Sequence, residues 1–318
     1  MDSKKYVLVT GGNGYLGQNL IKSIHSKHNT ISFDVKEIHE NKRIDKVVYL
    51  TGDIRDQSIN NIFEKYSIST VVHLAAIVVP PKSMTEQDVY EIDVDGTKKI
   101  LELCVQYNVQ QIVISSSGAS YGYYHDNPEW IDENSEIRGN DSFAYSRNKR
   151  LVEEILAEYR NKFPKLKQCI FRIGTILGEN TNNQITNLFH KKISIGILGS
   201  ESPFVFIWDQ DVVQIFSRAI ELKSEGIFNV AGDGKLSMKQ IAKITNQIRI
   251  LFPAWFLKMA IAILNFFKLT QYTTDQIDFL RYRPVLSNQK LKNVFGYTPL
   301  KTSEEVFKFY WESKKSAI

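Results

Sequence analysis

Seven short apolar runs, rich in Val and Ile, recur along the chain and alternate with segments of helical periodicity. Runs that are apolar on both faces, each followed by a helix, predict a parallel sheet covered by helices on both sides. The runs are YVLVT (6–10), TISFDV (30–35), KVVYLTGD (46–53), TVVHLAA (70–76), QIVISSS (111–117), QCIFRI (168–173) and GIFNVA (226–231). The sequence therefore predicts an α/β fold with a doubly wound parallel sheet.

The alternation loosens after Ile173, where the chain becomes polar and rich in turn residues. Strand-like order returns only around FVFIWDQDVV and GIFNV. We therefore expect a sheet domain formed by residues 1–174 with 204–231, and a smaller C-terminal lobe formed by 175–203 with 232–318. Ligands of open α/β sheets bind at the carboxyl ends of the strands, so this lobe is expected to close over that edge and bind the substrate.

The composition is that of an ordinary folded protein. Hydrophobic residues make up 43% and charged residues 24% of the chain, which excludes a disordered or disulfide-stapled design. The net charge of +5 is spread along the chain without a run of five like charges, so nucleic-acid binding is not indicated. Cys104 and Cys169 lie in apolar surroundings, as buried free thiols of a reducing compartment do.

Two segments of the chain bear on localisation. The N-terminal MDSKKYVLVTGG passes directly into a strand without the apolar stretch of a signal peptide, so we expect a cytoplasmic protein. The stretch 250–269 is the most apolar in the chain, but Lys258, Asn265 and Pro253 interrupt it. With these interruptions it lacks the roughly 18–20 consecutive apolar residues of a spanning helix, so we expect no spanning helix there. A buried helix or a weak membrane contact are the alternatives.

The stretch VTGGNGYLG (9–17) follows the first apolar run and precedes a helix. Gly12, Gly14 and Gly17 fit the pattern G-x-G-x-x-G, in which backbone N–H groups and the helix dipole face a pyrophosphate. A glycine-rich turn without a ligand is the alternative. Asp34 ends the second apolar run at the distance where an acid accepts hydrogen bonds from an adenosine ribose. Its charge disfavours a 2′-phosphate, so the sequence predicts NAD rather than NADP.

Tyr145 and Lys149 lie four residues apart on a predicted helix, so both side chains project from one face. A nearby ammonium favours the phenolate, and we expect Lys149 to move the pKa of Tyr145 toward a useful range. Ser117 ends the fifth apolar run, and its hydroxyl could hold a substrate oxygen against Tyr145. An exposed tyrosine and lysine without a catalytic role are the alternative.

Taken in order, six motifs resemble the extended short-chain dehydrogenase/reductase superfamily, the NAD-dependent epimerase/dehydratases. They are TGGNGYLG, Asp34, GDIRD (52–56), HLAA (73–76), ISSSGASYG (114–122) and YSRNK (145–149). The late motif FGYTPLKTSEEVFKFYWE extends the resemblance to the C-terminus.

The resemblance implies roles for residues at matching positions. Catalysis would fall to Ser117, Tyr145 and Lys149, with Tyr145 and Lys149 also at the cofactor. The remaining cofactor-binding residues would be Gly11, Gly14, Tyr15, Leu16, Gly17, Asp34, Asp53, Ile54, Leu74, Ala75 and Ala76. Hydride would pass between a carbinol carbon and the nicotinamide while Tyr145 carries the proton. Relatives commonly dimerise, so we expect a homodimer formed by the helices at about 94–107 and 142–161.

The substrate residues depart from the family pattern. Nucleotide-sugar members usually carry an Asn where this chain has Thr175, and an Arg where it has Phe204. The missing guanidinium argues against a UDP-sugar, unless Arg218, Arg249, Arg281 or Arg283 supplies the charge. Relatives also commonly have Asn in place of Asp93, and the absence of an acidic pair after Ser117 makes dehydration unexpected.

Aromatic residues are numerous in the predicted substrate lobe. Phe204, Phe206, Trp208, Trp255, Phe256, Phe266 and Phe267 would either pack as core or line a pocket for an apolar alcohol or ketone. The six histidines show no metal-ligand spacing, so we expect no catalytic metal. The sequence thus predicts an NAD-dependent oxidoreductase acting on a small-molecule substrate, of which Ser117, Thr175 and Phe204 would be contacts. A UDP-sugar 4-epimerase and a non-catalytic NAD-binding subunit are the alternatives.

Overall fold

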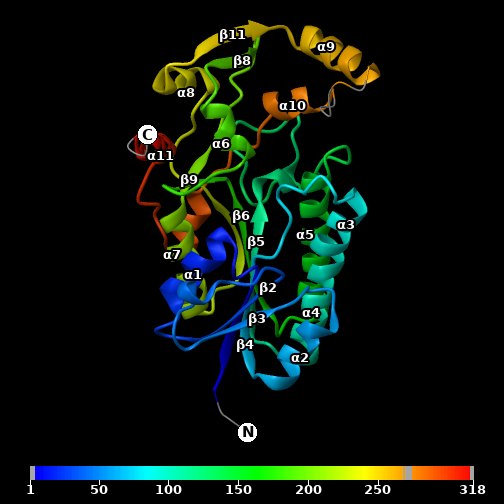
Figure 1. Cartoon of the computed structure of the whole chain (residues 1–318), viewed down its shortest axis with the longest axis vertical. Coiled ribbons are helices and arrows are strands. Elements are labelled where there is room, and N and C mark those ends of the chain that lie inside the picture. The colour runs from blue at the N-terminus through cyan, green and yellow to red at the C-terminus, as the bar shows by residue number, and fades with distance from the viewer. Residues whose placement is uncertain (1–3, 268, 270–273, 316–318) are drawn as a thin grey trace. The chain divides into compact units, whose positions relative to one another are not determined.

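The computed structural model describes residues 4–267, 269 and 274–315. A seven-stranded parallel sheet runs through it (Figure 1). Its strands are β1 Tyr6–Thr10, β2 Asn29–Asp34, β3 Val47–Thr51, β4 Ile68–His73, β5 Gln111–Ser117, β6 Lys167–Ile173 and β10 Gly226–Val230. Every strand coincides with a predicted apolar run to within a few residues. The α/β prediction is confirmed.

The strand order is β10-β6-β5-β4-β1-β2-β3. Strand β1 therefore lies between β2 and β4, with Val9 opposite Ser32 on one side and opposite Val72 on the other. The chain moves outward in one direction after β1 and in the other direction after β3, so the sheet is doubly wound, as predicted. The loops after β1 and β4 leave the same edge at this switch point, which is where open α/β sheets bind ligands.

Helices cover both faces of the sheet. They are α1 Tyr15–Ile24, α2 Gln57–Lys65, α3 Glu86–Tyr90, α4 Gly96–Gln106, α5 Ala144–Lys162 and α7 Asp209–Leu222. Helices α2, α4 and α5 share a hydrophobic core with the sheet, in which Leu8, Ile112 and Leu156 are fully buried (Figure 1). Helices α1 and α7 lie together elsewhere on the sheet, where the hydroxyls of Ser23 and Ser217 are 3.0 Å apart.

The chain divides into two compact units. The first contains Met1–Ser120, Phe143–Arg172 and Gln210–Phe228, and the second contains Tyr121–Ser142, Ile173–Asp209 and Asn229–Ile318. Segments 121–142, 173–174, 204–209 and 229–231 thus group with the second unit, whereas the sequence prediction has them in the sheet domain. Residues 316–318 of the predicted lobe lie outside the described residues. Assignment of the units to cofactor and substrate is a proposal taken up below.

The second unit contains short strands and helices. They are β7 Thr175–Leu177, α6 Gln184–Phe189, β8 Ile193–Ile197, β9 Phe206–Trp208, α8 Met238–Thr245, β11 Ile248–Phe252, α9 Ala254–Phe266, α10 Gln276–Arg281 and α11 Ser303–Lys315. Strands β7 and β9 form one two-stranded parallel sheet, and β8 and β11 form another. Short helical turns lie at Glu40–Lys42, Glu91–Asp95, Gly118–Tyr121 and Leu291–Phe295.

The segment FVFIWDQDVV is only partly a strand. Strand β9 covers Phe206–Trp208, and α7 begins at Asp209. The sequence indicated strand-like order around this segment, and that expectation is wrong for its second half. Val212 and Val213 are buried on the helix instead, because two adjacent apolar residues fit a helix that packs against a core.

Within the described part of the chain, none of the helices is long and apolar enough to reach across a bilayer. The predicted apolar stretch 250–269 becomes the end of β11, Pro253 and α9, while its Lys268 lies outside the described residues. Both cysteines are free and buried, as predicted, and burial raises the pKa of each thiol.

A buried ion pair joins three elements of the first unit. Glu153 of α5 accepts hydrogen bonds from the Arg172 guanidinium of β6 at 2.6–3.0 Å. Each side chain is only 4% exposed. The Ser116 hydroxyl of β5 donates to the same carboxylate at 2.5 Å. A charge buried this deeply is tolerated only when it is paired and hydrogen-bonded.

Removing one partner of this pair should therefore destabilise the fold. We expect Arg172→Met to lower the free energy of unfolding by about 3–5 kcal/mol, because Glu153 would keep an uncompensated buried charge. Equilibrium unfolding in urea measures the change. The matched control is Lys162→Met, which removes the exposed pair with Glu158 and should cost less than about 1 kcal/mol. Equal effects of the two variants would contradict the account.

Candidate active site

The glycine-rich turn joins β1 to α1 at the switch point of the sheet. Gly11 has a φ of +68°, and a Cβ there would lie 2.8 Å from the backbone nitrogen of Ala75. A side chain at this position is excluded both by conformation and by the close approach of the loop after β4. The turn and the loop carrying Leu74, Ala75 and Ala76 are therefore in direct contact. Both are predicted to bind the cofactor, which requires them to lie close together.

The other glycines of the turn differ in what surrounds them. A Cβ at Gly17 would lie 2.4 Å from the Gly11 carbonyl oxygen, and one at Gly12 would lie 2.3 Å from Ser32 Oγ. These two glycines are needed for packing of the turn itself. Gly14 meets only the Gly11 oxygen, at 3.2 Å, so the protein leaves more space on this side.

Gly14 is also the N-cap of α1, and no side chain caps the helix. The first turn of α1, which begins with Tyr15 and Leu16, contains no acidic residue. A helix N-terminus without a side-chain cap and without a competing carboxylate is a ready anion site. Together with the open side of Gly14, it fits the pyrophosphate of a dinucleotide.

Asp34 lies at the end of β2 beside this turn. Its Oδ2 accepts from the backbone N–H of Asn13 at 3.0 Å, and its Oδ1 accepts from that of Lys36 at 2.9 Å. The Asn13 side chain is itself held by Ser32 and the Lys36 carbonyl. The carboxylate is therefore fixed in position, and it retains lone pairs for further donors.

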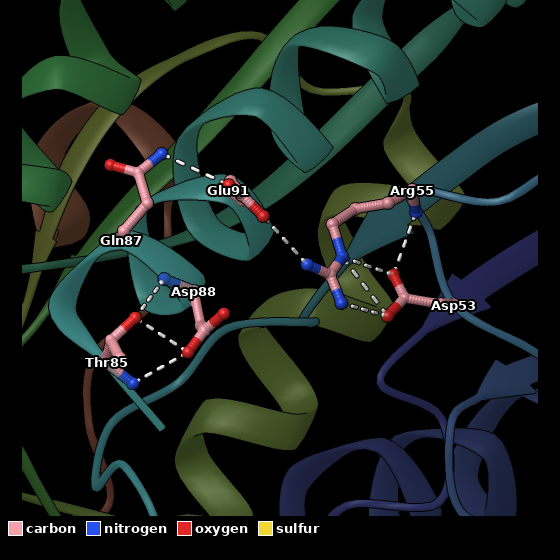
Figure 2. A network of polar contacts seen from close by, with 6 residues as sticks. All are labelled: Asp53, Arg55, Thr85, Gln87, Asp88 and Glu91. Atoms are coloured by element: carbon pink, nitrogen blue, oxygen red, sulfur yellow. Dashed lines mark hydrogen bonds and ion pairs between the residues drawn. The ribbon is translucent and has the colours of Figure 1, made fainter. Parts of the chain in front are cut away.

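Asp53 belongs to a polar network on the loop after β3 (Figure 2). The Arg55 guanidinium donates to both of its carboxylate oxygens, at 2.8–3.2 Å, and also to Glu91 at 3.2 Å. Hydrogen bonds from Arg55 lower the pKa of Asp53 below its usual range. The neighbouring Ile54 is 5% exposed and belongs to the core, so only its backbone is left to contact a ligand.

The loop after β4 is held by a buried histidine. His73 Nδ1 lies 2.7 Å from Thr10 Oγ1, and its Nε2 lies 3.0 Å from Thr97 Oγ1. Burial, with the charge of Lys149, lowers the pKa of His73 to about 3, so the imidazole is neutral. This histidine ties the end of β4 to β1 and α4 and thereby fixes the Leu74–Ala76 loop.

The structure brings Ser117, Tyr145 and Lys149 together. Ser117 ends β5, while Tyr145 and Lys149 lie in the first two turns of α5. The Ser117 hydroxyl interacts with the Tyr145 phenol and favours its ionised form. Lys149 Nζ donates to the carbonyl oxygen of Ser115 at 3.1 Å and lies 5.8 Å from the centroid of the Tyr145 ring.

The electrostatics of these groups differ from the sequence expectation. Burial raises the pKa of Tyr145, although the hydrogen bond from Ser117 opposes it. Burial likewise lowers the pKa of Lys149, against the charges of Asp93 and Glu153. The expectation that Lys149 brings the Tyr145 pKa down is not met, because desolvation is the largest effect on both groups.

Asp93 has an electrostatic effect on Tyr145 and Lys149 that the sequence did not predict. It is 3% exposed, and its Oδ1 accepts from the Ile77 N–H at 2.8 Å. Burial raises the pKa of Asp93, while Lys149 is the main opposing charge. It lies in a single π-helical turn, Glu91–Asp95, that separates α3 from α4. Such turns are often found at functional sites, a signal that a helical periodicity search does not register.

The second unit contains the other predicted contacts. The backbone N–H of Thr175, on β7, donates to Val205 at 3.1 Å. Phe204 is 2% exposed and stacks on Phe206 at 5.4 Å between ring centroids. The guanidinium carbon of Arg283 lies 3.8 Å from the centroid of the Phe204 ring.

Arg283 has a positive charge that no ion pair neutralises within the described residues. No carboxylate lies within ion-pair distance of it in the part of the chain that the structure describes, and its Nε has no hydrogen-bond partner there. Burial lowers the pKa of Arg283 to about 10, so the side chain remains charged at neutral pH. Arginines so placed recognise phosphate and carboxylate groups.

The seven aromatic residues predicted for the substrate lobe lie in two environments. Phe204 and Phe206 are core residues, whereas Trp255 and Phe266 on α9 are 67% and 81% exposed. They do not form one aromatic cluster. Among residues 4–267, 269 and 274–315, no group of three or more His, Cys, Asp or Glu side chains is placed to hold a metal ion.

Known proteins resemble this chain over most of its length. A putative UDP-glucose 4-epimerase of Methanocaldococcus jannaschii is 27% identical, covering 75% of this chain and 80% of its own. The N-acetyl-alpha-D-glucosaminyl-diphospho-ditrans,octacis-undecaprenol 4-epimerase of Escherichia coli O157:H7 is 27% identical, covering 81% and 77%. The crystal structure of Thermotoga maritima UDP-glucose 4-epimerase with UDP-glucose superposes with a TM-score of 0.75, at 18% identity, covering 98% and 99%. The structural likeness shows the shared fold.

The family model of the NAD dependent epimerase/dehydratase family matches residues 7–231. This span contains the glycine turn, Asp34, the Leu74–Ala76 loop and the Ser117, Tyr145 and Lys149 group. The predicted family resemblance, the NAD-dependent enzyme class and NAD as the cofactor are thereby confirmed. This chain belongs to the NAD-dependent epimerase/dehydratase family.

Proposed function

We propose that this enzyme catalyses hydride transfer between NAD and a secondary carbinol or carbonyl carbon, with Tyr145 as the proton carrier. The observation that carries the proposal is the meeting of Ser117 at the end of β5 with Tyr145 and the buried Lys149 at the start of α5, where Lys149 Nζ lies 5.8 Å from the centroid of the Tyr145 ring. A non-catalytic NAD-binding subunit would have no need for this buried lysine. The first unit would bind the cofactor, and the second would bind the substrate.

The residues proposed to hold NAD fit the group. Gly11, Gly14 and Gly17 form a turn that side chains would fill, with the uncapped N-terminus of α1 for the pyrophosphate. Asp34 would accept from the adenosine ribose, and the Asp53–Ile54 loop would contact the adenine. Leu74, Ala75 and Ala76 would line the middle of the cofactor, and Lys149 would contact the nicotinamide ribose. NAD supplies or accepts the hydride at its nicotinamide ring.

The protein residues would handle the proton. Because burial raises its pKa, Tyr145 is protonated at neutral pH and can donate to a carbonyl oxygen as it becomes an alkoxide. Ser117 would hold the same oxygen and hydrogen-bond to Tyr145. In the oxidative direction Tyr145 must first lose its proton, and the charge on Lys149 would stabilise that phenolate.

Replacing the proton carrier should slow the chemical step strongly without preventing NADH binding. We expect Tyr145→Phe to lower kcat about 10²- to 10⁴-fold, the usual contribution of a positioned acid or base. NADH consumption with a panel of ketones and UDP-4-ketosugars, alongside UDP-galactose conversion, measures it. NADH binding should persist, and Tyr159→Phe, on the same helix, serves as the control. Undiminished turnover in Tyr145→Phe would refute the assigned role.

Asp93 gives the proposal a pH dependence. Its charge raises the pKa of both Tyr145 and Lys149, so Asp93→Asn should lower both. The alkaline rise in the rate of alcohol oxidation, which follows loss of the Tyr145 proton, should then shift by about one unit toward lower pH. A pH–rate profile of kcat for both proteins tests this. An unchanged profile, or a shift to higher pH, would show that Asp93 does not act on Tyr145.

Arg283 favours a second, more specific candidate: 4-epimerisation of a sugar carried on a diphosphate. Such a reaction oxidises the carbon to a ketone and returns the hydride to the opposite face, so no cofactor is consumed. The named relatives act on UDP-linked or polyprenol-diphosphate-linked sugars, and a diphosphate is what an unpaired guanidinium recognises. Phe204 occupies the place of the family's usual arginine, and Arg283 stacked on it would restore the charge. The buried aromatic core around Phe204 gives the predicted apolar substrate no comparable support.

Arg283 provides the corresponding test. We expect Arg283→Met, which keeps the apolar stacking on Phe204, to weaken UDP binding roughly 10- to 100-fold through loss of charged hydrogen bonds. Calorimetric titration with UDP measures the change, and Arg218→Met, on the exposed face of α7, is the control. If the wild-type protein binds no UDP, or binds it equally well without Arg283, the diphosphate-sugar candidate fails while the hydride-transfer proposal stands.

The predicted homodimer is part of the proposal and would pair α4 and α5 with those of a second copy. Cytoplasmic localisation likewise stays a prediction of the sequence.

A further inference from the structure

Helix α9 exposes an unusual amount of apolar surface. None of its thirteen residues, Ala254–Phe266, is buried. Trp255 is 67% exposed, Ile263 51% and Phe266 81%. Large contiguous apolar surfaces are rare on soluble monomers and mark sites of interaction. No role proposed for the cofactor or the substrate uses this helix.

The exposed surface continues from α9 onto the small sheet of β8 and β11. Ile193 pairs with Ile248 and Ile195 pairs with Ile250, and all four side chains are exposed. Paired residues two apart along parallel strands point to the same face. At the end of β11, Phe252 stacks on Phe256 of α9 with 5.5 Å between ring centroids. Strand β11 leads directly into α9 (Figure 1). We call the exposed apolar side chains of β8, β11 and α9 the apolar patch.

The segments that contain the apolar patch have positively charged residues but no negatively charged ones. The chain contains 35 acidic residues, yet none falls within 180–200 or 234–267, the segments that contain the patch. These segments contain basic residues, of which Lys191, Lys192 and Lys243 are exposed. Two other lysines of these segments are paired, Lys258 with Asp278 of α10 at 2.6 Å and Lys235 with Glu129 at 3.1 Å. The surface is therefore both apolar and cationic.

This combination is complementary to an anionic lipid bilayer. A helix of this length extends about 20 Å, less than the roughly 30 Å of a hydrocarbon core, so it would lie along the surface. Exposed Trp and Phe side chains favour the boundary between headgroups and acyl chains. Nearby lysines add electrostatic attraction to anionic lipid. A second copy docked on the same patch would instead bring like charges together.

We propose that the apolar patch docks this enzyme peripherally on an anionic lipid surface, with α9 lying in the plane of the interface. Apolar side chains of α9 and the β8–β11 sheet would enter the headgroup boundary, and the lysines at the start of β8 would contact lipid phosphates. The inference goes beyond the proposed reaction and depends on none of the roles assigned to the cofactor site.

Vesicle flotation of the full chain tests the proposal. The protein is mixed with vesicles of phosphatidylcholine alone or with one-third phosphatidylglycerol. We expect binding to the anionic vesicles, weakened by salt. Trp255→Ser combined with Phe266→Ser should weaken it at least about tenfold through lost apolar burial. Lys191→Glu combined with Lys192→Glu should weaken it about tenfold or more.

Matched controls separate the patch from general effects. Leu222→Ser with Val294→Ser removes two exposed apolar side chains elsewhere, and Lys165→Glu with Lys167→Glu reverses two exposed lysines of the first unit. Both should bind like the wild type. Absence of binding to anionic vesicles, or binding unaffected by the patch variants, would overturn the proposal. So would a dimer in light scattering that only the Trp255 and Phe266 substitutions dissociate, since the patch would then be a contact between copies.

Discussion

The contact between the backbone of Gly11 and the loop after β4 is the constraint on which the rest of the cofactor site depends. It exists because β1 lies between β2 and β4 in the sheet. The loops after β1 and β4, which are distant in sequence, therefore leave the sheet at the same edge. A Cβ at Gly11 would come within 3 Å of Leu74 and Ala75, which leaves glycine as the residue that fits. The turn, the uncapped helix α1 and the small residues of the Leu74–Ala76 loop are positioned by this one approach.

Burial governs the chemistry of the group formed by Ser117, Tyr145 and Lys149. Desolvation raises the pKa of the phenol and lowers that of the ammonium, so each group is driven toward its neutral form. Asp93 and Glu153 oppose this effect at Lys149. Glu153 is itself held by the buried Arg172. The stability of the sheet and the charge state of the candidate catalytic lysine are thus linked through one carboxylate on α5.

Much of the fold could be predicted because its signals are local. Each strand of the large sheet is a continuous apolar run, and the glycine turn is readable from nine residues. The small strands β8 and β11 escaped prediction, since their pairing joins segments about fifty-five residues apart and β11 buries none of its residues. FVFIWDQDVV misled because one strand and one helix meet within it.

The sequence could nominate candidate site residues but not their electrostatics. The spacing of Tyr145 and Lys149, together with the family resemblance, nominated these residues and Ser117, whereas the direction of the Tyr145 pKa depends on burial that no spacing encodes. Arg283 could be named only as one of four arginines that might replace a missing charge. Its stacking on Phe204 depends on residues about eighty positions apart in the chain, and only the fold brings them together.

The most direct test of the central claim, an NAD site built on Gly11 and Asp34, is fluorescence titration of the wild-type protein with NADH and with NADPH. The account predicts that NADH binds more tightly, because the fixed carboxylate of Asp34 accepts from a ribose hydroxyl and repels a 2′-phosphate. Tighter binding of NADPH, or no binding of either, would contradict it.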